Sequence, residues 1–132
     1  MKTIKIIIEK SPDHYSAYAE NVEGVYGAGD TVEEAKESAL KGLELFVKYN
    51  EPKNVPAILK GEYKIEYKFD TQSLLNYYKG KLTLAGLEHI TGINRKQLQH
   101  YASGLKKPRP AQTKKIETAL HSLGSELMAV EL

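Results

Sequence analysis

A group of polar side chains in the second half of the chain has the types and the spacing that contact DNA. A helix is predicted over residues 94–103, where the apolar Leu98 and Tyr101 lie three positions apart and face a core. Four side chains are left on its outer face: Arg95, Lys96, Gln99 and His100. Arginine and lysine donate hydrogen bonds to guanine edges, and glutamine pairs with adenine through two hydrogen bonds. This face therefore predicts a helix that reads bases in the major groove.

Further polar residues flank this helix at both ends. Asn94 is expected to cap its amino terminus and to contact a phosphate there, because the backbone N–H groups at a helix start attract anions. After the helix, a Gly-Leu-Lys-Lys-Pro turn is surrounded by residues that suit phosphate contacts: Ser103, Lys106, Lys107 and Arg109. Such a basic turn can also be only a solvated loop, but its place directly after the predicted reading helix favours phosphate contact.

Four helices are predicted to position these side chains: residues 70–78, 82–91, 94–103 and 110–123. Gly92 permits the tight turn between the second and the third, and Asn94 with Gln97 three positions later predicts a cap for the third. Two segments of alternating apolar and polar residues, 62–69 and 126–132, bracket these helices. We expect these two segments to pair as an antiparallel β-ribbon that closes the domain or joins two copies of it.

The first half of the chain predicts three strands: residues 4–8, 15–20 and 25–28. A helix follows, which Thr31 can cap with Glu34 in the capping-box position, and apolar residues recur at helical spacing as far as Val47. Asn50 and Pro52 end this helix. The pattern predicts a β-β-β-α unit with one helix laid across a face of an antiparallel sheet.

The charge of the chain divides at a predicted linker over residues 53–61, which separates a first domain, 1–60, from a second, 61–132. The net charge of +2 is the sum of −2 in the first domain and +4 in the second. Residues 79–115 contain nine basic side chains and one acidic side chain. A field of one sign at that density indicates an anionic partner for the second domain.

Several kinds of site are excluded or not expected. The chain has no cysteine, so disulfides, thiolate metal sites and cysteine nucleophiles are excluded. No apolar run approaches the roughly 18 residues that span a bilayer, and the first ten residues lack the pattern of a signal peptide. The histidines show neither metal-ligand spacing nor an accompanying nucleophile motif. We therefore expect a cytoplasmic protein with no membrane association, no cofactor, no metal site and no catalytic residues.

The segment TGINRKQLQHYASGLKKPRP resembles the helix-turn-helix of phage-repressor and Cro-like regulators. The likeness extends from Leu82 to about Gly124 and rests on the glycine turn, on Leu98 and Tyr101, and on the Tyr-x-Ser-Gly-x-x-Lys-Pro ending. Glu88 departs from it, because that family prefers a small residue there. A buried carboxylate without a partner is costly, so we expect Glu88 to turn outward or to pair with a nearby base.

In the first half of the chain, the segment YSAYAENVEGVYGAGDTVEEAKESALKGLELFV resembles the HicB antitoxins. The resemblance implies an α+β protein, with a partial RNase H-like β-β-β-α domain joined to a helix-turn-helix domain. It also implies a type II antitoxin that binds a HicA-like, RNA-cleaving toxin and represses its own operon by binding operator DNA. By position, the toxin would contact the second and third strands and their turn, at Tyr18, Glu20, Asn21, Glu23 and Tyr26. The turn lacks the two prolines that many relatives carry.

Two other functions stay open at this stage. The first is a one-component regulator whose sheet domain senses a small molecule, although no ligand motif supports it. The second is a metal-dependent nuclease, which needs carboxylates that converge on two ions; the available acids, Asp13, Glu20 and Asp30, fall at turns or strand ends. In the antitoxin interpretation the chain is expected to be a homodimer or a higher homo-oligomer, because one helix-turn-helix makes too few specific contacts alone.

Overall fold

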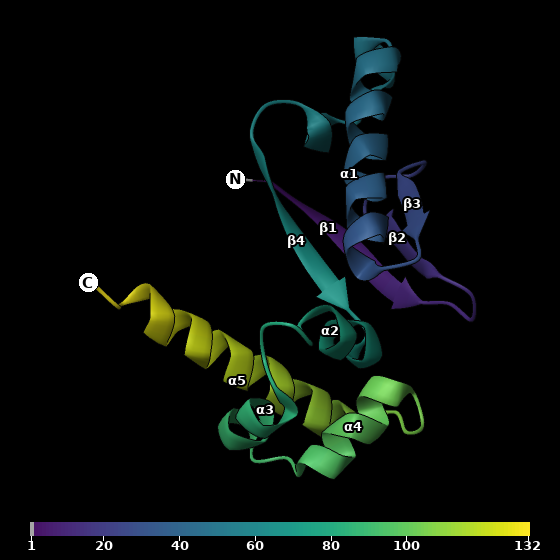
Figure 1. Ribbon diagram of the computed structural model, residues 1–132. Coiled ribbons are helices and arrows are strands. Elements are labelled where there is room, and N and C mark those ends of the chain that lie inside the picture. Colours follow the sequence, from purple (N-terminus) through teal and green to yellow (C-terminus); the bar gives the residue numbers. More distant parts are fainter. Residues whose placement is uncertain (1) are drawn as a thin grey trace. The chain divides into compact units, whose positions relative to one another are not determined.

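The computed structural model of the chain describes residues 2–132, which form an α+β fold with one four-stranded mixed sheet and five α-helices (Figure 1). The strands are β1 (Lys2–Lys10), β2 (Tyr15–Ala19), β3 (Tyr26–Gly29) and β4 (Tyr63–Phe69). The helices are α1 (Val32–Tyr49), α2 (Thr71–Tyr77), α3 (Leu84–Thr91), α4 (Arg95–Ser103) and α5 (Pro110–Met128). Two single-turn 3-10 helices, Pro52–Asn54 and Ala57–Leu59, lie between α1 and β4. The chain divides into two compact units after Ser73.

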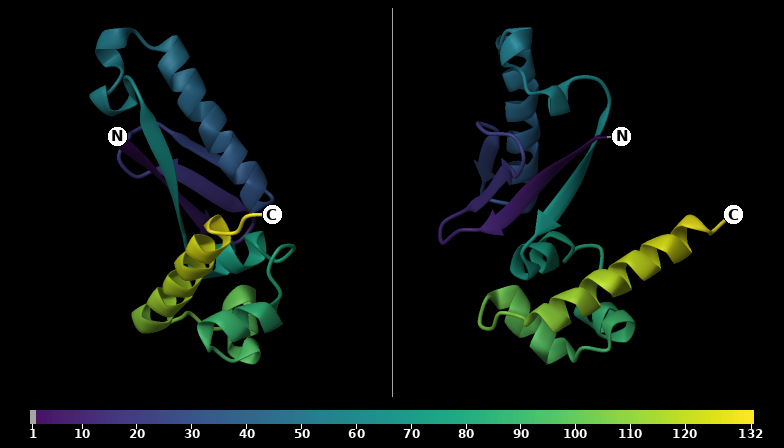
Figure 2. Two further views of the ribbon diagram at one scale, coloured as in Figure 1. Left: turned by 90° about the vertical axis from the view of Figure 1, so that its left-hand side faces the viewer. Right: turned by 180° about the vertical axis from the view of Figure 1, so that it is seen from behind.

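The sheet of the first unit has the strand order β3-β2-β1-β4, with β1 antiparallel to β2 and parallel to β4. The first unit is therefore β-β-β-α-β, and the predicted division at residue 60 is wrong. Strand β4 belongs to the first unit because its inner side chains, Ile65 and Tyr67, align with Ile4 and Ile6 of β1. Figure 2 shows α1 on one side of this sheet.

Alternation along the strands builds the core between the sheet and α1. Ile4, Ile6 and Ile8 are all fully buried, as the period of two predicts. The helix comes so close to β3 that a Cβ on Gly27 would lie 2.4 Å from the backbone nitrogen of Ala39. Glycine is required there because any side chain would push the helix off the sheet.

The start of α1 confirms the predicted cap. The Thr31 hydroxyl accepts a hydrogen bond from the backbone N–H of Glu34 at 3.1 Å. The Glu34 carboxylate returns to accept from the backbone N–H of Asp30 at 2.9 Å. The first bond satisfies a donor that the first turn of a helix leaves without a partner, and the second ties the residue before the cap to the helix, so the helix begins directly after Thr31 as predicted.

The second unit packs the part of α2 from Leu74 onward, α3, α4 and α5 around a small apolar core. Its buried members are Leu75, Leu87, Ile93, Leu98, Tyr101 and Ile116. The helices predicted at 82–91 and 94–103 begin one or two residues later than expected, and their ends at Thr91 and Ser103 are as predicted. These side chains hold α3, α4 and the first half of α5 together.

The predicted β-ribbon is wrong. Strand β4 pairs with β1, and the segment 126–128 of the expected tail strand is the last part of α5. The tail is helical because Leu120, Leu123 and Leu127 continue the helical spacing of the buried Ile116, and Gly124 does not interrupt it. Figure 2 shows this carboxy-terminal part of α5, in yellow, extending beyond α3 and α4.

The structural boundary sharpens the charge difference between the two parts. The first unit has ten basic and thirteen acidic side chains, net −3, and the second has nine and four, net +5.

Within residues 2–132, no helix is long and apolar enough to cross a bilayer.

Candidate nucleic-acid interface

Helices α3 and α4 are joined by a turn of three residues. Gly92 has a left-handed backbone with φ 75°, and its N–H donates to the carbonyl of Glu88 at 2.8 Å, which closes α3. Ile93 is buried in the core, and Asn94 starts α4 by accepting from the backbone N–H of Lys96 at 2.8 Å. The positive φ explains why glycine stands at this position. The turn fixes which face of α4 is exposed.

The predicted partnership of Asn94 with Gln97 is only half right. Asn94 caps α4, but the Gln97 amide donates to the Tyr101 hydroxyl at 2.9 Å instead of returning to the cap. A second cap comes from Glu88 of α3, whose Oε2 accepts from the backbone N–H of Arg95, the first residue of α4, at 2.7 Å.

Glu88 also binds the side chain of Arg95. Its Oε1 lies 3.0 Å from Nη2 and 3.2 Å from Nε of the guanidinium. This confirms that the unexpected carboxylate finds a base. The backbone N–H of Arg95 and then its guanidinium lower the pKa of Glu88, against a smaller opposing effect of partial desolvation. Arg95, predicted to read bases, is instead held by Glu88 in this structure.

Lys96 and Gln99 are exposed on α4, as predicted. Within residues 2–132 their side chains make no hydrogen bond or ion pair. The backbone of Lys96 is fixed by Asn94, so the lysine side chain starts from a rigid position. These two side chains are the best placed on α4 to reach an external partner.

His100 is positioned differently from the prediction, whereas Ser103 lies exposed at the end of α4, beside the turn. His100 is half-buried, and its Nδ1 is buried with no hydrogen-bond partner among residues 2–132. The Ser103 hydroxyl donates to the His100 carbonyl at 3.2 Å and accepts from the N–H of Leu105 at 3.3 Å. Ser103 therefore closes the end of α4 and stays exposed, whereas the half-buried His100 is not presented on the outer face as Lys96 and Gln99 are.

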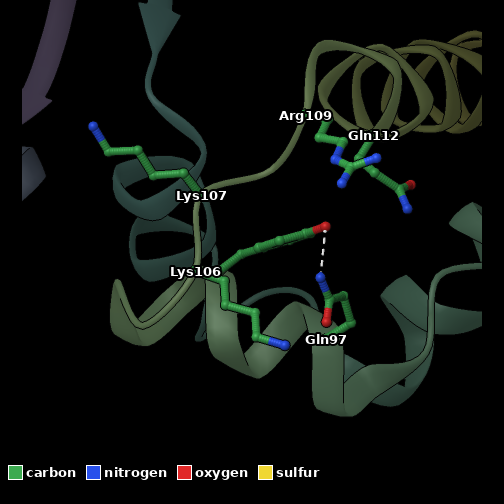
Figure 3. Close-up of a pocket in the computed structure, with 6 residues that line it drawn as sticks. Gln97, Lys106, Lys107, Arg109 and Gln112 are labelled. Carbon is green, nitrogen blue, oxygen red and sulfur yellow. Dashed lines mark hydrogen bonds between the residues drawn. The ribbon is translucent and has the colours of Figure 1, made fainter.

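A polar pocket of about 530 Å³ lies between α4, the turn after it and the start of α5 (Figure 3). Its lining residues are Gln97, Tyr101, Lys106, Lys107, Arg109 and Gln112. Figure 3 shows Arg109 and Gln112 side by side, whereas Lys107 extends away from the other labelled side chains. No acidic side chain lines the pocket, so it suits an anion such as a phosphate.

Sequence reasoning found the lysines and the arginine of this pocket but missed its three neutral members. The sequence predicts a capping role for Gln97 and a core position for Tyr101, whose ring is indeed buried. The spacing of four residues between Gln97 and Tyr101 was the available signal, because it places both on one side of α4. Gln112 gave no signal, since it lies fifteen residues further along the chain than Gln97.

The predicted toxin-binding residues Tyr18 and Tyr26 lie opposite each other on β2 and β3. Gly27 faces α1, so by alternation both tyrosines lie on the uncovered face of the sheet. Tyr26 is 73% exposed, and the Tyr18 hydroxyl donates to Glu9 at 3.1 Å. Desolvation raises the pKa of Tyr18, and Glu9 and Glu20 add to this effect.

The three polar residues predicted beside these tyrosines have different roles. Asn21 ties the turn after β2 to β1: its amide donates to the Thr3 carbonyl at 3.0 Å, and its Oδ1 accepts from the backbone N–H of Lys5 at 3.4 Å. Glu20 lies 3.9 Å from the Lys5 ammonium, and Glu23 is exposed. Asn21 is thus a structural residue, whereas Glu20 and Glu23 remain accessible.

Within residues 2–132, no group of three or more histidine, cysteine or acidic side chains is arranged to hold a metal ion. Comparisons with known protein families, with curated proteins and with solved structures find no match to this chain.

Proposed function

We propose that this chain is a DNA-binding antitoxin that represses its own operon. In this proposal α3 and α4 form a helix-turn-helix, α4 enters the major groove, and the first unit binds a HicA-like toxin. The observation that carries the DNA-binding part is the exposure of Lys96 and Gln99 on α4 beside the cationic pocket.

The contacts on α4 divide into two kinds. Lys96 and Gln99 are exposed and start from a capped, rigid helix, so they can donate to base edges. Lys106 and Arg109 lie in the pocket beyond the end of α4, where a phosphate would be held and the helix would be fixed in register. The net charge of +5 on this unit adds attraction to any DNA sequence.

The toxin-binding part rests on the resemblance to HicB antitoxins and on the surface of the first unit. This unit has a net charge of −3, which suits a cationic RNA-binding protein. Its uncovered sheet face presents Tyr26, with Glu20 and Glu23 nearby in sequence. An exposed tyrosine beside carboxylates is the kind of surface that anchors protein interfaces.

DNA binding is tested by selecting bound duplexes from a random pool with the full chain at low salt. We expect enrichment of a repeated half-site, with centres one helical turn, about 34 Å, apart. The affinity for the selected duplex should exceed that for random duplex by at least about 10³-fold. Equal affinities would remove the sequence-specific regulator.

The antitoxin part is tested with the neighbouring reading frames in the genome. We expect one of them to encode a small basic protein that arrests growth when expressed alone and co-purifies with this chain. Co-expression of the chain should restore growth, and Tyr26→Ala together with Glu23→Ala should weaken the rescue. If no neighbouring reading frame arrests growth when expressed alone, the antitoxin role is contradicted. DNA binding is then judged by the duplex selection alone.

A further inference from the structure

Strand β4 is an outer edge of the sheet, since it pairs only with β1 in the strand order β3-β2-β1-β4 (Figure 1). The backbone N–H of Asp70 donates to the Ile8 carbonyl at 3.3 Å. Because ladder bonds alternate along a strand, the backbone groups of Lys64 and Glu66 face β1 and those of Tyr63 and Ile65 face outward. A strand edge of this kind is a template for a further strand.

The helix-covered face beside this edge is also incomplete. Helix α1 lies over β2 and β3, and an open apolar groove remains between α1 and β4. Its apolar lining residues are Leu40, Leu43, Val47, Leu59, Tyr63 and Ile65. Val47 is 39% exposed, and the inner side chains of β4 are only half-buried. A strand added to β4 would cover this groove with its own inward side chains.

The charges on the opposite face of β4 indicate which strand that is. Glu62, Lys64, Glu66 and Lys68 alternate in sign and are all exposed. If a second β4 pairs antiparallel with Ile65 opposite its own copy, Lys64 faces Glu66 and Glu62 faces Lys68 of the other chain. Every directly opposed pair on that face is then of opposite charge, which stabilises cross-strand pairing.

Other registers are disfavoured by the same four residues. A slip by two positions places Glu66 opposite Glu66, or Lys64 opposite Lys64, of the second chain. A slip by one position turns the apolar side chains to the charged face. Registers centred on Tyr63 or Tyr67 keep the apolar face but oppose only two of the four charged side chains of each strand. The register centred on Ile65 keeps the apolar face and opposes all four in pairs of opposite charge.

We propose that β4 is a self-association edge: two copies of this chain pair through antiparallel β4 strands, centred on Ile65, and form one continuous sheet of eight strands. In the single chain the Lys64 ammonium lies 3.2 Å from Glu66. In the proposed pair, the Lys64 ammonium instead contacts the Glu66 carboxylate of the other chain. The proposal concerns the first unit alone and does not depend on DNA binding.

Two charge reversals of the full chain test this pairing by sedimentation equilibrium. Lys64→Glu places a second carboxylate opposite Glu66 of the other copy, and Glu66→Lys places a second ammonium opposite Lys64 of the other copy. We expect the self-association constant of each variant alone to fall roughly tenfold. In an equimolar mixture all four opposed pairs between the two different variants are again of opposite charge, so the association of the wild type should return.

The control is the exposed pair Lys114 and Glu117 on α5, 3.2 Å apart. Lys114→Glu and Glu117→Lys, alone or mixed, should leave the association constant unchanged. Circular dichroism and urea midpoints of all four variants establish that each is folded. The proposal is overturned if the β4 variants associate like the wild type, if mixing them restores nothing, or if the wild type stays monomeric at hundreds of micromolar.

Discussion

The Glu88 carboxylate holds Arg95 in two ways, with Oε2 2.7 Å from the backbone nitrogen and Oε1 3.0 Å from Nη2 of the guanidinium. It thereby joins α3 to the first residue of α4 across the turn at Gly92. The carboxylate that looked out of place in the sequence helps to set the angle between the two helices on which the proposed DNA contact depends.

Replacing this carboxylate should make stability less dependent on pH. The lowered pKa of Glu88 means that the folded protein binds this proton less tightly than the unfolded chain, whose usual value is 4.5. The contribution of Glu88 is therefore fully present above about pH 4.5 and is lost as pH falls through the lowered pKa. Urea denaturation should show Glu88→Gln less stable than the wild type at pH 7, with the difference shrinking below pH 4.5. A difference that is constant down to pH 3 would refute this role.

The pocket residues Lys106 and Arg109 should bind phosphate without regard to sequence. Each alanine variant is expected to weaken binding to selected and random DNA by the same factor. The slope of log K against log salt should fall in magnitude by about 0.9 for each lost contact. Anisotropy titrations at several salt concentrations measure both, with Lys41→Ala in the first unit as the control. An unchanged slope would exclude the pocket from phosphate binding.

The close approach of α1 to β3 predicts a large difference between two glycines. Gly27→Ala would place a Cβ 2.4 Å from a backbone atom of α1, so it should cost about 1–3 kcal/mol or more in the free energy of unfolding. Gly124→Ala meets nothing within 4 Å inside α5 and should stabilise the chain by about 0.5–1 kcal/mol. Thermal and urea unfolding of the two variants compare the sites, and a Gly27→Ala protein of wild-type stability would mean that the helix does not lie this close.

Tyr26, a proposed toxin contact, and Asn21, which ties the turn to β1, are expected to respond differently to substitution. Tyr26→Ala should change stability by less than about 0.5 kcal/mol, because the side chain is exposed, but should weaken toxin binding by about 2 kcal/mol. Asn21→Ala should instead destabilise the chain by about 0.5–1.5 kcal/mol, because it removes hydrogen bonds between the turn and β1. Calorimetric titration with the toxin and urea unfolding distinguish the two effects. If Asn21→Ala weakened toxin binding and Tyr26→Ala did not, the turn and not the tyrosine would contact the toxin.

Local signals in the sequence predict most of the helices and strands. They do not predict which strand pairs with β4, or that the segment 126–128 is helical. The cap at Thr31 and the glycine at 92 fix where helices start and end through neighbouring residues, so they could be predicted. The alternation in residues 62–69 correctly predicted a strand and its two faces, but its partner β1 lies about sixty residues earlier, and alternation carries no information on pairing. The short apolar alternation of residues 126–132 alone predicts a strand, whereas Leu127 continues the helical spacing of Ile116 and Leu120, and the segment up to Met128 is helical.

The candidate site could be predicted in the same partial way. Helical periodicity predicts that Lys96 and Gln99 are exposed, and the basic turn after α4 identifies Lys106 and Arg109. The commitment of Arg95 to Glu88 depends on the turn that brings two helices together, seven positions apart in sequence, and a helical wheel does not contain it.

Lys96→Ala tests most directly whether α4 reads DNA. On the selected duplex the variant should lose about 1–3 kcal/mol of binding free energy, with a much smaller loss on random duplex of the same length. Arg95→Ala, whose guanidinium is held by Glu88, should lose less discrimination between the two duplexes than Lys96→Ala. An equal loss on both duplexes for Lys96→Ala, or no loss on either, would contradict base reading by α4.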